Sequence, residues 1–369
     1  MNAPAPHLTI VAASDALTHV RTAQEITARA LEARGLSGEL VVAGDASEIR
    51  SVIASADGEA IVVPGSVDPG PGGWGWAAEV LRVDFGQCSP DRSAGVRAHI
   101  RGRGLDGLGF AVDSWYHHRF FPGEVVDYGD HWEQRAELRL PNGVGPFPVA
   151  VLVHGGYWRS RWEYDLMDAA AVDLTARGYA TWNVEYRRPD EHGWAATTDD
   201  VAAAVDTLAD LEQAPLLDLD RVAVLGHSAG GQLALRACAD AVADGEMRVC
   251  PTVAVSLAGV LDLRLGDERW LSEGAVSAAL GGRYGAASAI YEESSPAHRL
   301  PLGLRQVVVC CVDDDPNLLE TSRAYVRDAI AATDPVTVIE DTGGHFAVID
   351  PTAPVWDRIC TELRLHTTR

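Results

Sequence analysis

Short apolar runs alternate with helical stretches along this chain, and the alternation occurs in two successive blocks. In the first block, apolar runs lie at 8–13, 38–44, 60–66 and 80–86, and helical stretches at 17–34 and 46–56. Consecutive strands separated by helices are joined by crossover connections, which build a parallel sheet covered on both faces. The sequence therefore predicts an α/β fold.

The second block repeats the pattern with different sequences. After a softer region at 119–134, strand-like runs lie at 180–188, 221–228, 252–259, 305–312 and 336–342, with helical stretches at 199–211 and 317–332. A chain of 369 residues is long enough for two domains of about 150 residues each. Because no internal repeat relates the blocks, we expect two different α/β domains, at 1–120 and 135–369, joined by a linker at 121–134.

Composition excludes several classes of function. All 30 basic residues are arginine, against 53 acidic residues and a net charge of −23. Pyridoxal enzymes, Schiff-base aldolases, P-loop NTPases, protein kinases and Ser-Lys hydrolases all need a lysine amine, which this chain lacks. A nucleic-acid-binding protein needs a basic face. We therefore expect no nucleic-acid partner.

The sequence also favours a cytoplasmic location without a membrane partner. No apolar run approaches the roughly 18 residues of a membrane span, and the first residues lack the form of a signal peptide. The cysteines are scattered, without a CxxC pair, which is typical of reduced thiols rather than disulfides or zinc ligands. These cysteines are Cys88, Cys238, Cys250, Cys310, Cys311 and Cys360.

The strongest chemical motif is the G-x-S-x-G pentapeptide around Ser228, from Gly226 to Gly230. It follows an apolar strand and precedes a helical stretch, which is the context of a nucleophile elbow. A serine on such a tight turn needs small neighbours on both sides, and the helix start behind it supplies a backbone N–H. We therefore predict that Ser228 is a nucleophile.

An elbow serine needs a base and an orienting acid later in the chain, in the order serine, acid, histidine. His345 follows the last strand-like run and two glycines, and is the predicted base. Three consecutive acids, Asp313, Asp314 and Asp315, follow the preceding strand. We favour Asp315, because DPNLL matches a pattern common after this strand, with Asp314 as the alternative; the remaining acids would be solvated turn residues.

The segment HGGYW at 154–158 lies about 70 residues before the elbow. Adjacent glycines let backbone N–H groups approach a carbonyl oxygen closely. We expect the backbone of Gly155, Gly156 and Tyr157 to form an oxyanion hole with the amide of Ala229. A plain glycine turn is the alternative.

Residues from about 125 to 369 resemble an α/β-hydrolase, and HGGYW, GHSAGG and GHFAVIDP are similar to the kynurenine formamidase-like and esterase/peptidase-like branch. This resemblance implies hydrolysis of a small carboxylic ester or amide through an acyl-enzyme, without cofactor or metal; acyl transfer by the same residues is the alternative. The segment 260–300 leaves room for a small cap. Trp158 and Trp270 are candidate pocket walls, with core packing as the alternative.

The first block resembles a type II 3-dehydroquinate dehydratase over about 110 residues, which implies a flavodoxin-like parallel sheet. Its departures argue against that activity. The family's catalytic tyrosine is missing, since no tyrosine precedes Tyr116, and Val63 replaces its asparagine; Asp84 or Phe85 replaces its histidine. We therefore expect an inactive domain that serves as scaffold, ligand-binding regulator or homo-oligomer contact.

Two weaker motifs in the first block and the linker carry no prediction of a ligand. Gly102, Gly104 and Gly107 match a dinucleotide pattern, but arginines interrupt it and no ribose-binding acid follows. His117, His118 and His131 lack the spacing of metal ligands.

Overall fold

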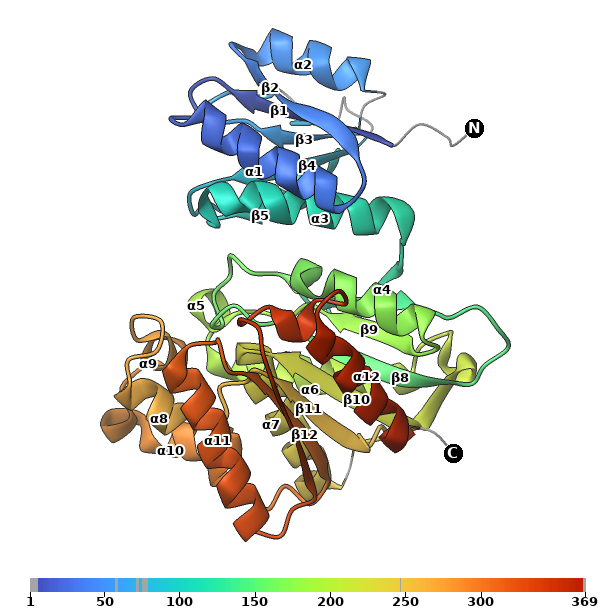
Figure 1. Ribbon diagram of the computed structural model, residues 1–369, viewed down its shortest axis with the longest axis vertical. Coiled ribbons are helices and arrows are strands. Elements are labelled where there is room, and N and C mark those ends of the chain that lie inside the picture. Colours follow the sequence, from blue (N-terminus) through green and yellow to red (C-terminus); the bar gives the residue numbers. More distant parts are fainter. Residues whose placement is uncertain (1–5, 57–58, 71–72, 75–78, 246, 368–369) are drawn as a thin grey trace. The chain divides into compact units, whose positions relative to one another are not determined.

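The computed structural model describes the whole chain except residues 1–5, 57–58, 71–72, 75–78, 246 and 368–369 (Figure 1). The chain divides into two compact units, Met1–Pro122 and Gly123–Arg369. The prediction of a cytoplasmic location used the first residues of the chain. Of these, residues 1–5 lie outside the described part. Each unit is described separately below.

The described part of the first unit contains a five-stranded sheet and three α-helices. Its strands are β1 His7–Ala13, β2 Ser37–Ala43, β3 Glu59–Val63, β4 Glu79–Asp84 and β5 Val96–Arg101; its helices are α1 Val20–Ala33, α2 Ala46–Ser55 and α3 Gly107–Phe120, the last preceded by the 3-10 turn η1 Gly104–Asp106. All strand pairs are parallel, in the order β2-β1-β3-β4-β5. This is the flavodoxin-like order, so the predicted fold class is confirmed.

The alternation of side chains along β1 explains why helices cover both faces of this sheet (Figure 1). Leu8 and Ile10 are buried in one apolar cluster with residues of α1 and α3. Val11 lies in a second cluster with Ile49 and Ile53 of α2. Successive side chains of a strand point to opposite faces, so an uninterrupted apolar run needs a helix on each side.

The sequence did not predict β5. Its residues, Val96–Arg101, include two arginines and a histidine, so the segment lacks the apolar run that marked the other strands. The backbone pairs with β4 in parallel, from Val80 with Val96 to Asp84 with Arg101. As the last strand in the sheet order, β5 is an edge strand, where polar side chains are tolerated.

The second unit contains an eight-stranded sheet. Its strands are β6 Glu124–Asp127, β7 Arg135–Arg139, β8 Phe147–Val153, β9 Ala180–Val184, β10 Leu217–His227, β11 Val253–Leu257, β12 Arg305–Cys311 and β13 Val336–Asp341. Their order is β13-β12-β11-β10-β8-β9-β7-β6. The pairs β6–β7 and β7–β9 are antiparallel, and the described pairs from β9 to β13 are parallel.

Helices cover both faces of this sheet. They are α4 Asp168–Ala176, α5 Pro189–His192, α6 Trp194–Asp206, α7 Ala229–Asp244, α8 Leu263–Glu268, α9 Ala275–Leu280, α10 Tyr284–Ser294, α11 Pro316–Ala331 and α12 Pro354–Thr367, with 3-10 turns η2 Tyr164–Met167, η3 Thr207–Ala209, η4 Ala214–Leu216, η5 Pro296–His298 and η6 Ala347–Ile349. One apolar cluster joins the sheet to α6, α7 and α11, and another joins it to α4 and α12.

The structure also bears on the predicted linker and the predicted cap. The segment 121–134, predicted as a linker, is largely part of the second unit, because β6 pairs with β7 and Glu133 is fully buried. The short helices α8, α9 and α10 occupy the segment expected to form a small cap. A search of the described residues finds no helix long and apolar enough to cross a membrane.

Candidate active site

Ser228 lies on a strained turn between β10 and α7. Its backbone has φ 54° and ψ −120°, a conformation that L-residues rarely adopt. The flanking glycines are required by space: a Cβ on Gly226 would lie 2.0 Å from the carbonyl oxygen of Gly230, and one on Gly230 would lie 2.2 Å from that of Val153. The local geometry is that of the predicted nucleophile elbow.

Parallel pairing brings the predicted site segments to one edge of the sheet. The strands β8, β10, β12 and β13 run in the same direction, so the loops that follow them leave at the same edge. These loops carry HGGYW, Ser228, the three acids and His345, in that order of strands. Residues more than 100 positions apart in the sequence therefore meet.

His345 lies beside the elbow and contacts His227. The ring centroids of these histidines are 4.7 Å apart, and Nε2 of His227 lies 3.0 Å from the carbonyl oxygen of His345. Since the partner is a carbonyl, Nε2 of His227 must donate the proton of this bond. The bond ties the loop after β13 to the residue that precedes Ser228.

The three consecutive acids have separate roles, and they correct the prediction that Asp315 pairs with His345. Oδ2 of Asp314 lies 2.8 Å from Nδ1 of His345. The Asp315 carboxylate instead accepts the amide of Asn317 at 2.8 Å and caps α11. Asp313 accepts the amide of Gly343 at 2.9 Å. Asp313 and Asp315 are exposed, as expected for turn residues, and each also accepts a backbone amide.

The HGGYW loop lies against the elbow. A Cβ on Gly155 would lie 2.8 Å from Cβ of Ser228, so only glycine allows this approach. Gly156, Tyr157 and Trp158 all have positive φ, at 113°, 52° and 56°. Ala229 is the first residue of α7, where a backbone N–H has no acceptor within the helix. Two of the residues predicted for an oxyanion hole, Gly155 and Ala229, thus lie next to Ser228.

Burial and charge shape the titration of this region. Burial, together with the neighbouring charge of His345, lowers the pKa of His227 from 6.5 to about 3, so its ring stays neutral. Burial raises the pKa of Tyr157, and the negative charges of Asp315 and Asp314 raise it further. The phenol of Tyr157 therefore lies within the field of the acid-bearing loop.

The two tryptophans predicted as pocket walls differ in their environment. Trp158 is 1% exposed, donates its indole N–H to Oε1 of Gln232 at 3.1 Å, and packs edge-to-face on Trp194. This burial corrects the pocket prediction for Trp158 and favours the alternative of core packing. Trp270, between α8 and α9, is 53% exposed and remains accessible to a ligand.

The sequence did not predict a role for Glu185, which contacts His154 at the start of the HGGYW loop. This fully buried carboxylate lies 3.2 Å from Nε2 of His154 and accepts the amide of Tyr164 at 3.0 Å. The hydroxyl of Tyr186 donates to the carbonyl oxygen of His154 at 2.9 Å. Glu185 lies in the VEYRRP segment, where an acid directly after an apolar strand could have signalled a buried role.

In the first unit, the residues that depart from the dehydratase pattern have structural partners. Val63 is buried at the end of β3. Asp84, at the end of β4, pairs with Nε of Arg82 at 2.6 Å and with Nε2 of His99 at 2.7 Å. Burial raises the pKa of Asp84, but the hydrogen bonds from His99 and Arg82 outweigh it and hold the pKa below its usual value.

Comparisons with known proteins concern the second unit. The BD-FAE family model matches residues 138–295. Esterase B from Lactobacillus rhamnosis HN001 is 19% identical, with a TM-score of 0.57 over 66% of this chain and 84% of that protein. A truncated carbohydrate esterase from gut microbiota is 16% identical, with a TM-score of 0.59 over 66% of this chain and 95% of that protein.

A bacterial heroin esterase is 22% identical, with a TM-score of 0.54 over 63% of this chain and 78% of that protein. Among curated proteins, no sequence matches the chain. The structural likenesses show that the second unit has the α/β-hydrolase fold. Together with the family match, they support an ester hydrolase of that fold.

Proposed function

We propose that this protein is a serine hydrolase that cleaves a small carboxylic ester or amide with Ser228, His345 and Asp314. The observation that carries the proposal is the 2.8 Å contact between His345 and Asp314, located beside a serine in the strained elbow conformation. A serine hydroxyl becomes nucleophilic only when a base accepts its proton. Asp314 would orient the imidazole and stabilise its protonated form.

In the proposed reaction, Oγ of Ser228 attacks the acyl carbonyl carbon and its proton passes to Nε2 of His345. His345 then protonates the leaving alcohol or amine, and water repeats the sequence to release the acid. The described residues contain no hydrogen bond between Ser228 and His345. Catalytic hydrogen bonds of this kind are often long or poorly aligned without substrate and tighten when it binds.

The negative oxygen of the tetrahedral intermediate would be stabilised by backbone N–H groups. The amide of Ala229 and the amides around Gly156 and Tyr157 are the donors that we propose, as the sequence predicted. A donor of this kind typically contributes a factor of about 10²–10³ to kcat. The positive end of α7 adds to this effect.

Small acyl esters are the substrates that the likenesses favour. Solved structures similar to this chain include esterase B inhibited with a C4-C4 SN3 tributyrin phosphonate, and an esterase from Thermogutta terrifontis with butyrate bound. We infer that short-chain acyl esters are accepted here. Formamides, which the kynurenine formamidase-like motifs suggest, are the second group to test, and exposed Trp270 is the proposed contact for the leaving group.

A fluorophosphonate probe tests the nucleophile directly. We expect the probe to label the full chain at Ser228 and to leave the Ser228→Ala variant unlabelled. Ser288→Ala, on the exposed surface of α10, is the matched control and should label like the wild type. Failure of the folded wild type to label and to hydrolyse p-nitrophenyl butyrate would refute the proposal. Product analysis with an added alcohol acceptor distinguishes hydrolysis from acyl transfer.

We further propose that the first unit resembles the dehydratase family without its activity. Val63 is buried, and Asp84 is held by an ion pair with Arg82 and a hydrogen bond from His99, which supports a structural role for both positions. The full-length Ser228→Ala variant should show no turnover of 3-dehydroquinate, and measurable dehydration would contradict this. Light scattering on the same sample tests the predicted homo-oligomer.

A further inference from the structure

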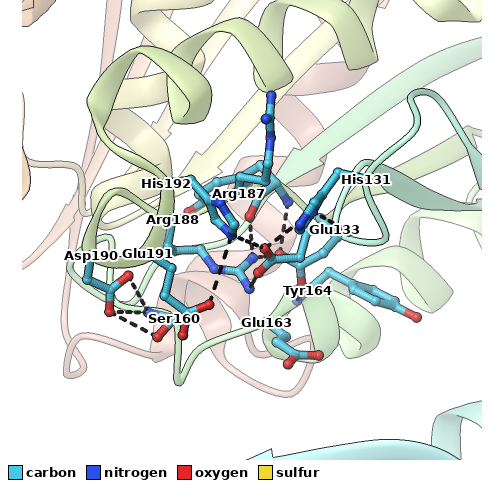
Figure 2. Close-up of polar contacts among 12 residues, drawn as sticks. His131, Glu133, Ser160, Glu163, Tyr164, Arg187, Arg188, Asp190, Glu191 and His192 are labelled. Carbon is cyan, nitrogen blue, oxygen red and sulfur yellow. Dashed lines mark hydrogen bonds and ion pairs between the residues drawn. The ribbon is translucent and has the colours of Figure 1, made fainter. Parts of the chain in front are cut away.

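Two histidines and a glutamate of the second unit lie close together in space. None of them lies near Ser228 in the sequence. His131 and Glu133 lie in the turn between β6 and β7, and His192 is the last residue of α5. Figure 2 shows both imidazole rings beside the Glu133 carboxylate. Sequence reasoning considered His131 only with His117 and His118, which are its neighbours along the chain but belong to the first unit.

The distances between the donor atoms suit a tetrahedral metal ion. Oε2 of Glu133 lies 2.9 Å from Nε2 of His192 and 3.6 Å from Nδ1 of His131, and one ligand atom from each residue lies within 4.8 Å of the others. In a zinc site with bonds near 2.1 Å, ligand atoms are about 3.4 Å apart. We propose that His131, Glu133 and His192 bind a divalent transition-metal ion of the zinc class.

An unsatisfied buried oxygen points to a ligand at this position. Glu133 is fully buried, and within the described part of the chain its Oε2 atom accepts no hydrogen bond of suitable angle, with Nε2 of His192 2.9 Å away. Burying a carboxylate oxygen without a hydrogen bond is costly, whereas a bound cation would satisfy it. The same oxygen is the atom that both histidines approach.

The other carboxylate oxygen of Glu133 is already held. Oε1 pairs with the buried guanidinium of Arg188 (Figure 2). The same guanidinium also pairs with Glu185. A hydrogen-bonded partner behind a ligating carboxylate fixes the direction of its free oxygen. Arg188 therefore orients the Glu133 carboxylate and leaves Oε2 to face the histidines.

Solvent can reach the site from the side of the histidines. The side chains of His131 and His192 are 32% and 26% exposed, so an ion has a path to Oε2. A water molecule would complete four-fold coordination. A donor set of two imidazoles and one carboxylate is one that zinc accepts.

Metal titration tests this proposal. We expect chelator-treated full-length protein to take up one Zn²⁺ per chain from a competing chromophoric chelator, and Co²⁺ to give a visible spectrum without thiolate bands. His131→Gln and His192→Gln should each weaken Zn²⁺ binding at least tenfold. His366→Gln, which removes an imidazole from a pair with Glu362 on α12, is the matched control and should bind like the wild type.

Further measurements separate a metal site from a plain ion pair and from binding elsewhere. Cys88 lies near Asp84 and His99, a second group of possible ligands in the first unit, so Cys88→Ser tests binding elsewhere. Zn²⁺ should raise the Tm of the wild type and of Cys88→Ser, but not that of the His131→Gln/His192→Gln variant, whose circular dichroism should stay native. Equal Zn²⁺ binding by the wild type and the double variant would overturn the proposal. So would the absence of stoichiometric binding by the wild type, which would mean that His192 and Glu133 form only an ion pair.

Discussion

Nδ1 of His345 lies 2.8 Å from Oδ2 of Asp314, while the adjacent Asp315 directs its carboxylate to the amide of Asn317 at the start of α11. Two neighbouring acids of the same chemistry thus have different partners. The division arises because the chain turns from β12 into α11 within four residues. It makes the identity of the orienting acid a question that paired variants can answer.

The first prediction compares Asp314→Asn with Asp315→Asn. An asparagine at 314 cannot stabilise the protonated imidazole, so kcat/KM for a short-chain ester should fall by roughly 10³–10⁴-fold. An asparagine at 315 can still cap α11, so the same constant should change by less than about threefold. Steady-state kinetics on both variants provides the measurement. A larger loss at 315 would show that the static contact misidentifies the acid.

The second prediction concerns the space around the elbow. A methyl group at Gly230 would lie 2.2 Å from the carbonyl oxygen of Val153 and 2.4 Å from that of His154. The backbone would have to move to accommodate it. Gly230→Ala should lower the free energy of unfolding by about 2–4 kcal/mol. Gly285→Ala in α10, where a Cβ meets nothing within 4 Å, should keep or raise stability by up to about 1 kcal/mol. Urea unfolding measures both.

The third prediction follows from the pKa of His227, which is about 3 in the folded protein against 6.5 ordinarily. Between these pH values the unfolded chain binds a proton that the folded protein does not. Stability from this group is therefore complete above pH 6.5 and is lost as the pH falls, by up to about 1.4 kcal/mol per pH unit. His227→Gln keeps an N–H donor but cannot titrate.

Urea unfolding between pH 4 and pH 8 checks the sign. The unfolding free energy of the wild type minus that of His227→Gln should decrease steadily as the pH falls. An unchanged difference across this range would mean that the pKa of His227 is the same in the folded and the unfolded chain, and would contradict the prediction.

The fourth prediction concerns the buried ion pairs of Arg188. Its side chain is fully buried between Glu133 and Glu185. Arg188→Met would leave two carboxylates buried without their cation and should cost about 3–5 kcal/mol of stability. Arg248→Met removes a guanidinium that is 50% exposed and pairs with Asp206 and Asp210, and should cost less than about 1 kcal/mol. Thermal and urea unfolding of both variants give the comparison.

Much of the fold could be predicted from patterns that are local in the sequence. The run 305–312 became β12, and the helical stretch 317–332 became α11, each within one residue. The strand β5 was not predicted because its polar side chains interrupt the apolar run, although its last three residues are buried. The strand β6 escaped for a related reason: three of its four residues are exposed, so no apolar run marks it.

The sequence by itself predicted the elbow at Ser228 and the proposed base at His345, because both predictions depend on short-range constraints: small residues around a tight turn, and a histidine after the last strand. Only the tertiary structure decided which acid faces that histidine, since the direction of a carboxylate depends on how the chain enters α11. The meeting of His131, Glu133 and His192 likewise required the fold. His131 and Glu133 lie in the turn between β6 and β7, and His192 lies at the end of α5. Spacing along the chain does not show that residues of such separate elements meet.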